Sequence, residues 1–201
     1  MRLRKGHWRN DSEGVDSGPL TVETVDNHVY FYAEVTPDRT LALMQTLRAL
    51  DGKLRTEKIS RGLADDVILP IWLHINSVGG DPFSAFAVYD QINKLHTPVY
   101  SIVEGRVASA ATIISVGCPR RYCQPSAFML IHSATSISWG EFTHTELADE
   151  AKFLEALVNQ MVAHYAEHSK LDEETVRNYI SRDCWMTAQQ ILEYGFADAY
   201  L

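Results

Sequence analysis

The sequence predicts a single domain of the α/β class, and two strand, glycine turn and helix units carry this prediction. The first unit spans residues 67–95 and is divided by the glycine pair Gly79-Gly80, with Pro82 suited to the first position of the helix. The second unit spans residues 99–117. Apolar strands that alternate with helices are the pattern of α/β folds, and the near-continuous apolar run over residues 67–75 is typical of a strand covered on both faces.

The elements before these units are predicted from composition and spacing. Residues 28–35 are rich in β-branched and aromatic side chains, which predicts a strand. Leucines at helical spacing predict a helix over residues 40–50, and the charged residues 51–66 predict a long surface connection. Residues 1–27 are polar and open with a basic patch, so they predict a weakly ordered leader ahead of a single domain over residues 28–201.

The elements after the two units follow from the same reasoning. Residues 121–124 and 127–131 predict two further strands. Apolar side chains recur every three or four positions over residues 147–165, which predicts a long helix with an extensive packed contact. Asp172 is suited to cap a helix that runs to residue 180. The run Thr187-Ala-Gln-Gln has the form of a capping box that opens a last helix, with Gly195 as its stop.

Composition excludes several classes of function. The net charge is −8 and the cations are scattered, which argues against nucleic acid as a partner. No stretch approaches the roughly 20 apolar residues of a membrane span. The three cysteines, an odd number, indicate a reducing compartment such as the cytoplasm or an organelle matrix or stroma. Cys118 and Cys123 lack a second pair of ligands with metal-site spacing, so they are expected to be ordinary thiols and no metal is predicted. No organic cofactor is predicted either.

Ser109 and His132 are candidates for a nucleophile and its general base. Ser109 follows an apolar strand pattern and precedes a helical one, a place where a serine taken alone predicts a helix cap. His132 ends the predicted strand over residues 127–131, where a structural histidine is about equally expected. Because the carboxyl ends of parallel strands share one edge of a sheet, both side chains are expected at that edge. A hydroxyl beside an imidazole is the arrangement that acyl transfer needs.

Acyl transfer also needs donors for an oxyanion and a group that orients the base. The main-chain N–H groups of Gly80 and Ala110 are candidates for the donors. Gly80 has no Cβ, so a substrate can approach its backbone closely, and Ala110 begins a helix whose dipole favours negative charge. Four carboxylates remain open as the orienting acid: Asp149, Asp172, Asp183 and Asp198. Along the chain the order is Ser, His, Asp, which differs from the triad orders of chymotrypsin, subtilisin and the α/β-hydrolases, and Ser109 does not lie in a G-x-S-x-G elbow. A serine hydrolase with this order belongs to another lineage.

Five segments, in this order along the chain, resemble the proteolytic subunit of the Clp protease, a serine peptidase family of the crotonase-like superfamily. They are residues 75–80, 105–110 and 129–132, the dipeptide Arg182-Asp183, and residues 193–198. The resemblance implies a crotonase-like spiral of βαβ units with a long protruding handle helix. It selects Asp183 as the acid of a Ser109, His132 and Asp183 triad, and it implies an oxyanion hole at Gly80 and Ala110.

The same resemblance implies a serine endopeptidase that cleaves unfolded or short polypeptides inside two stacked heptameric rings. Arg182 and the helix over residues 147–165 would then contribute to contacts between the rings. Val78, Arg106 and Ala110 replace the usual proline, glutamine and methionine, and the segment after His132 also departs from the family. These departures fit a divergent or phage-type member, and pairing with an AAA+ unfoldase stays open.

Two alternatives compete with this hypothesis. The run His164-Tyr-Ala-Glu-His168 fits the H-x-x-E-H zinc-peptidase pattern, although an exposed histidine pair on the long helix explains it more simply. A catalytically silent Clp-like ring or scaffold subunit would keep the fold without the peptidase activity.

Overall fold

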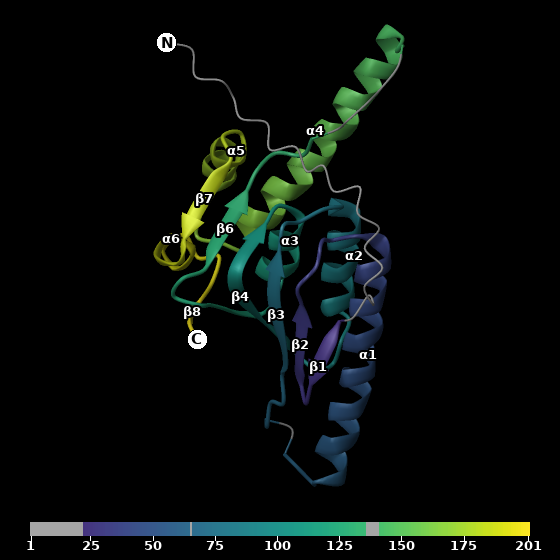
Figure 1. The fold of residues 1–201 in the computed structure, drawn as a ribbon, viewed down its shortest axis with the longest axis vertical. Coiled ribbons are helices and arrows are strands. Elements are labelled where there is room, and N and C mark those ends of the chain that lie inside the picture. The colour runs from purple at the N-terminus through teal and green to yellow at the C-terminus, as the bar shows by residue number, and fades with distance from the viewer. Residues whose placement is uncertain (1–21, 65, 136–140) are drawn as a thin grey trace.

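A computed structural model of the chain describes residues 22–64, 66–135 and 141–201, and in these ranges the fold is built around one eight-stranded sheet (Figure 1). The main path follows the order β1 (Glu23–Val25), β2 (His28–Phe31), β3 (Ile71–Ser77), β4 (Val99–Ala108), β5 (Arg120–Cys123) and β8 (Ala199–Tyr200). Strand β6 (Phe128–Ile131) pairs with the far end of β4, and β7 (Cys184–Thr187) pairs with β6. The strands from β2 to β6 pair in parallel, as the predicted α/β class requires.

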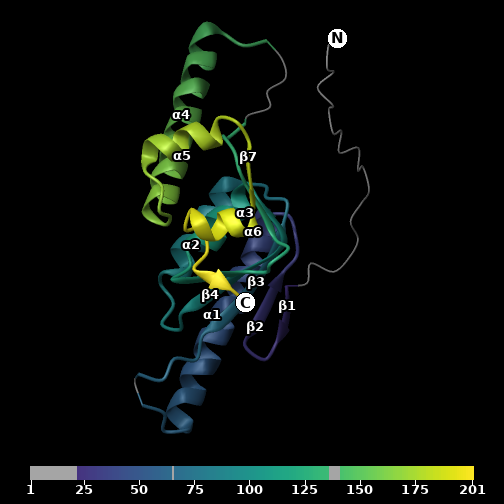
Figure 2. The same cartoon turned by 90° about the vertical axis from the view of Figure 1, so that its left-hand side faces the viewer.

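Six helices accompany the sheet in the described ranges. They are α1 (Pro37–Ser60), α2 (Pro82–Ile92), α3 (Ala110–Val116), α4 (His144–Glu167), α5 (Glu173–Ile180) and α6 (Ala188–Glu193). Helices α1, α2 and α3 pack in sequence beside one another, and α4 contacts α3. Helix α5 packs on α4, while α6 lies beside β6 and β7 (Figure 2).

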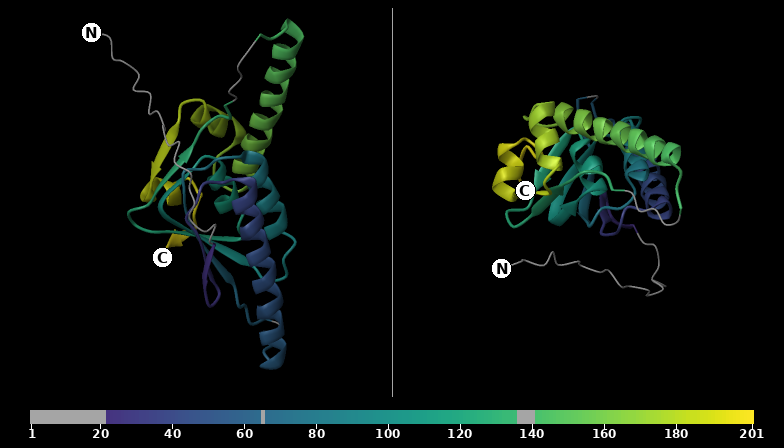
Figure 3. Two further views of the ribbon diagram at one scale, coloured as in Figure 1. Left: turned by 45° about the vertical axis from the view of Figure 1, so that its right-hand side comes forward. Right: turned by 90° about the horizontal axis from the view of Figure 1, so that it is seen from above.

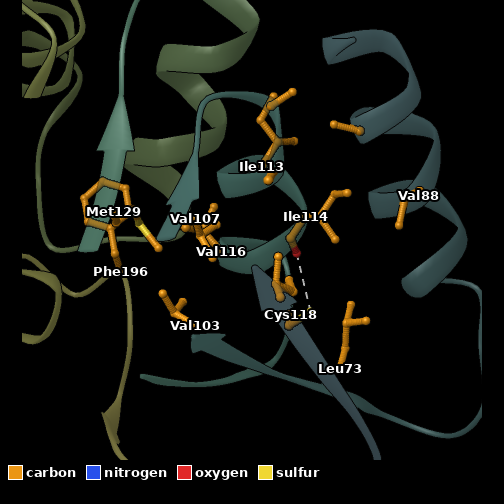
Figure 4. Close-up of a cluster of buried hydrophobic side chains, with 14 of the residues drawn as sticks. Leu73, Val88, Val103, Val107, Ile113, Ile114, Val116, Cys118, Met129 and Phe196 are labelled. Atoms are coloured by element: carbon orange, nitrogen blue, oxygen red, sulfur yellow. Dashed lines mark hydrogen bonds between the residues drawn. The ribbon is translucent and has the colours of Figure 1, made fainter. Parts of the chain in front are cut away.

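The hydrophobic core lies between the sheet and this helical layer. Leu73 and Val103 from the strands meet Val88 of α2 and Ile114 of α3, and all four side chains are fully buried (Figure 4). Burial of each such side chain contributes about 1.5–3 kcal/mol. Strand β3 begins at Ile71, later than the apolar run over residues 67–75 suggested. Its side chains Leu73 and Ile75 are buried in the core, and on the other face Trp72 packs with Tyr100 and Tyr122.

Helix α1 is longer than the sequence analysis predicted. The surface connection expected over residues 51–66 is wrong for residues 51–60, which continue the helix. The apolar stripe runs on to Leu54, which is buried, and Asp51 on the same helix accepts a hydrogen bond of 2.8 Å from the main-chain N–H of Thr97. The charged side chains that suggested a loop therefore belong mostly to the solvent-facing side of a helix.

Part of the expected leader belongs to the sheet. Residues 23–25 form β1, which pairs antiparallel with β2 ahead of the boundary expected at residue 27. The basic patch at residues 2–9 lies outside the described residues. The division into a leader and one domain stays a prediction.

The long helix predicted over residues 147–165 is α4, with 24 residues. Thr143 and Glu146 form a capping box at its start, and the residues buried in α4 all lie in its C-terminal half. The N-terminal half projects from the body of the molecule (Figure 3). The extensive packed contact expected of its stripe is thus confined, within the described chain, to the second half. Where the chain is described, no helix is both long and apolar enough to cross a membrane.

Candidate active site

Ser109 and His132 lie within hydrogen-bonding distance of each other. Nε2 of His132 is 2.7 Å from Oγ of Ser109. Ser109 occupies the N-cap position of α3, but its side chain makes no capping hydrogen bond. The Ser109 hydroxyl is therefore engaged by an imidazole and not by the helix end, and an imidazole at this distance can accept the hydroxyl proton.

The parallel pairing of β4 with β6 brings these two residues together. Ala108 at the end of β4 is the register partner of Leu130 in β6. The ladder continues for one step, because the N–H of Ser109 donates to the carbonyl of Leu130 at 2.8 Å. Both strands then leave the sheet at the same edge, so the residues after them meet there. This is the juxtaposition that the sequence predicted.

Hydrogen bonds hold the backbone of Ser109 in a conformation that L-residues rarely adopt. Its φ is 56° and its ψ is −130°. The hydroxyl of Thr112 donates to the Ser109 carbonyl at 2.6 Å, so the hydroxyl of the fully buried Tyr165, 2.7 Å away, donates to Thr112. A non-glycine residue in such a region costs on the order of 1–3 kcal/mol and persists only where its surroundings impose it. The backbone of Ser109, the residue that carries the candidate nucleophile, is therefore strained.

This strain predicts that glycine at position 109 gives a more stable protein than alanine at the same position. Ser109→Gly is expected to raise the free energy of unfolding by about 1 kcal/mol relative to Ser109→Ala, because glycine adopts a positive φ without a Cβ conflict. Chemical denaturation of the two variants at equal protein concentration measures the difference. Equal or lower stability of the glycine variant would show that the turn is not strained.

The glycine pair lies against the turn that holds Ser109. A Cβ on Gly79 would come within 2.6 Å of Cβ of Ser109, and one on Gly80 would lie 2.2 Å from the carbonyl oxygen of Val35. Within the described chain, no hydrogen bond engages the N–H of Gly80 or of Ala110. Uncommitted main-chain donors beside a hydroxyl are what an oxyanion hole requires.

These groups line one pocket of about 230 Å³. Gly80, Ser109, Ala110 and His132 all contribute to its wall. The rest of the lining includes side chains that the sequence analysis did not assign to the site: Phe83, Glu150, Phe153, Leu154, Leu157 and Met161. Five of these six belong to α4. For the four apolar ones the helical spacing was the signal in the sequence, although it was interpreted as a packing stripe, whereas no pattern singled out Glu150.

Asp183 is placed opposite His132 by the sheet but does not contact it. Cys184 and Ile131 are the last pair in the antiparallel ladder of β6 and β7. One residue beyond this pair, Asp183 and His132 face each other. Asp183 is exposed and has a φ of 55°, and no hydrogen bond or ion pair joins it to His132 in the described chain. Backbone register thus brings Asp183 to the site, whereas its side chain is not engaged there.

The other three candidate acids have different partners. Asp149 pairs with Lys152 on the surface of α4. Asp172 caps α5 by accepting from the N–H of Thr175, as predicted. Asp198 accepts from the backbone and the guanidinium of Arg121. Asp183 is the one of the four that lies next to the histidine in the sheet.

The zinc-peptidase pattern falls on histidines that are already engaged. His164 is buried and its Nε2 donates to the carbonyl of Ile113 at 2.9 Å, while Nε2 of His168 lies 3.2 Å from the hydroxyl of Tyr89. Among the described residues, no group of three potential ligands is arranged to hold a metal ion. The cysteines add none: Cys118 and Cys123 are buried, and burial raises their pKa values to about 12 and about 11.

Burial makes His164 a source of acid sensitivity. Burial lowers the pKa of His164 to about 4, below the ordinary value near 6.5. Between pH 6.5 and pH 4 the unfolded chain therefore binds a proton at His164 that the folded chain does not bind. The free energy of unfolding is highest above pH 6.5 and falls by about 3 kcal/mol as the pH is lowered to 4. His164→Leu is expected to flatten the pH dependence of the unfolding free energy over this range. Identical pH profiles for both proteins in urea titrations would contradict this.

Comparison with known proteins agrees with the fold. The sequence model of the Clp protease family matches residues 25–201. The chain is 30% identical over 179 residues to the ATP-dependent Clp protease proteolytic subunit of Ligilactobacillus salivarius, covering 88% of this chain and 83% of that one. It is 35% identical over 137 residues to the proteolytic subunit of Streptococcus pneumoniae, covering 67% and 70%.

A third relative matches over a shorter region. Proteolytic subunit 2 of the ATP-dependent Clp protease of Treponema denticola is 38% identical over 129 residues, and the match spans 63% of each chain, less than two thirds. The family model covers most of the chain, and the crotonase-like α/β fold with a protruding helix is confirmed. The chain belongs to the Clp protease family.

Proposed function

We propose that the chain is a serine endopeptidase subunit that cleaves peptide bonds of unfolded or short polypeptides. One observation carries the proposal: the Ser109 hydroxyl lies 2.7 Å from Nε2 of His132, in a pocket that also presents the free amides of Gly80 and Ala110. Nucleophile, base and oxyanion donors are the parts that acyl transfer needs, and their convergence supports the activity.

In the proposed reaction, Nε2 of His132 takes the proton of the Ser109 hydroxyl as Oγ attacks the carbonyl carbon of the scissile bond. The N–H groups of Gly80 and Ala110 donate to the tetrahedral oxyanion. The protonated imidazole then gives its proton to the leaving amine, and the C–N bond breaks. Water, deprotonated by the same imidazole, attacks the acyl ester and releases the second product together with the Ser109 hydroxyl.

Asp183 is proposed as the residue that orients His132. A change of its exposed side chain and of the turn before β7 would bring the carboxylate to Nδ1, since the backbone already places the two residues side by side. The carboxylate would then hold the tautomer that leaves Nε2 free to accept a proton.

We further propose that the active form is a homo-oligomer, with stacked heptameric rings enclosing the sites. The relatives are named as proteolytic subunits of an ATP-dependent protease. For this chain the names support a subunit of a larger protease that works with an ATPase, which we propose to be an AAA+ unfoldase that supplies polypeptide. The odd number of cysteines supports the cytoplasm or an organelle matrix or stroma as its compartment. Light scattering on the purified protein tests the assembly.

A catalytically silent ring or scaffold subunit is the second candidate, because Asp183 makes no contact with His132. A fluorophosphonate probe separates the two functions. An active serine becomes phosphonylated, and mass spectrometry of the digest then locates the adduct on Ser109. An assembled protein without an adduct would favour the scaffold, and activity that is lost only with a chelator would favour zinc chemistry at His164 and His168.

A further inference from the structure

We infer that Glu150 makes this site selective for a lysine or arginine side chain beside the scissile bond. The inference rests on the proposed peptidase function and concerns the pocket that Ser109 and His132 line. Glu150 lies in the second turn of α4 and forms part of the wall of that pocket.

Glu150 gives the pocket its charge. Among the described residues that line the pocket, it is the one carboxylate, and no lysine or arginine accompanies it. Glu150 is half-buried, and the described chain gives it no hydrogen bond and no ion pair. Its two acidic neighbours in the first turns of α4 are engaged elsewhere: Glu146 in the capping box and Asp149 with Lys152. A partly desolvated carboxylate without a partner is stabilised by a cation that a ligand brings.

The remaining walls suit the stem of a long cationic side chain. The rings of Phe83 and Phe153 stack with centroids 5.8 Å apart and an interplanar angle of 21°. Leu154, Leu157 and Met161 continue the apolar lining along α4. Lysine and arginine lay their methylene stems along apolar surfaces while the charged end reaches a polar group. Aromatic faces within reach of the cation add to the attraction.

The same arrangement discriminates against other side chains. An aspartate or glutamate in this pocket would face the charge of Glu150, and like charges at short range are disfavoured. A purely apolar side chain fits the walls but displaces water from the carboxylate without replacing its hydrogen bonds. The pocket, at about 230 Å³, is smaller than the roughly 300–1,000 Å³ typical of small-molecule sites, which suits one side chain.

The test is the cleavage of matched fluorogenic peptides that differ only in the residue before the scissile bond. Lysine, norleucine and glutamate are compared, since norleucine keeps the stem of lysine and lacks its charge. The wild-type protein is expected to prefer lysine over norleucine in kcat/KM by about tenfold, with glutamate cleaved least. Cleavage-site mapping in a peptide library shows whether the preference falls on the residue before or after the cut.

Two variants assign the preference to Glu150. Glu150→Gln is expected to lower the lysine-to-norleucine ratio about tenfold, and Glu150→Lys is expected to invert the order of lysine and glutamate. Glu155→Gln changes an exposed carboxylate of α4 outside the pocket lining and is expected to keep the wild-type ratio. Ratios within one protein cancel any loss of total activity that a variant causes.

Labelling of Ser109 by the fluorophosphonate separates this inference from the proposed function, because the probe needs no side chain in the pocket. A labelled protein whose ratio is the same in wild type and in both Glu150 variants would overturn the inference and leave the peptidase function standing. A protein that neither labels nor cleaves any peptide would overturn both.

Discussion

Replacement of Ser109 by alanine is expected to lower kcat/KM for a short fluorogenic peptide by about four orders of magnitude or more. The reason is the loss of the nucleophilic oxygen, Oγ of Ser109, which lies 2.7 Å from Nε2 of His132. His132→Ala is expected to cost a similar factor, because a neutral hydroxyl without a base is a poor nucleophile. In the double variant the losses should not add, since nucleophile and base act as one unit.

Ser126→Ala is the matched control for this measurement. Ser126 is an exposed serine between β5 and β6, away from the residues that line the pocket. Its removal is expected to leave the peptide turnover and the fluorophosphonate labelling of Ser109 unchanged. Wild-type turnover in Ser109→Ala, with the assembly intact, would assign the activity to another group and refute the proposed mechanism.

Replacement of Gly80 by alanine is expected to destabilise the fold by about 3 kcal/mol and to abolish cleavage. Gly80 has a φ of 145°, and a Cβ there would lie 2.2 Å from the carbonyl oxygen of Val35. That carbonyl accepts from Asp81, and the N–H of Val35 donates to Gly79, each at 2.8 Å. Relief of the clash would break these hydrogen bonds and move the amide proposed for the oxyanion.

Gly52→Ala provides the opposite control. Gly52 lies inside α1, where an added Cβ would meet nothing within 4 Å. Alanine is expected to stabilise the protein there by about 0.5–1 kcal/mol, because glycine is costly within a helix. Urea unfolding of both variants measures the contrast. A Gly80→Ala protein as stable as the wild type would mean that the turn before α2 tolerates a side chain.

The sequence was most informative where chemistry depends on the ends of strands. The meeting of Ser109 and His132 could be predicted because parallel strands align their carboxyl ends. The choice of Asp183 could not, since four carboxylates fit and only the family resemblance selected one. The antiparallel pairing of β6 with β7, which places Asp183 beside the histidine, depends on a strand that local pattern did not indicate.

Elsewhere one pattern had two physical meanings. The stripe over residues 147–165 indicated a packed face, and the structure divides that face between the core and the wall of the pocket. The spacing of apolar residues indicates only that their side chains share one face of a helix. It cannot distinguish a face that packs on the core of the same chain from a face that contacts a bound ligand. Charged residues 51–60 were misleading for a related reason, because a helix with a narrow buried stripe has the composition of a loop.

The position of α4 couples substrate recognition to helix formation. Its last turns are anchored by the Tyr165 to Thr112 hydrogen bond, whereas its first turns lie beyond the body of the protein. Glu150 and Phe153 lie in the N-terminal half of α4, where Phe153 stacks on Phe83 of α2, so an occupant that touches both residues binds only while this part of the helix is formed. By mass action, any molecule held in the pocket must slow hydrogen exchange in that half of the helix, and a contact that winds the helix from outside must tighten binding in return.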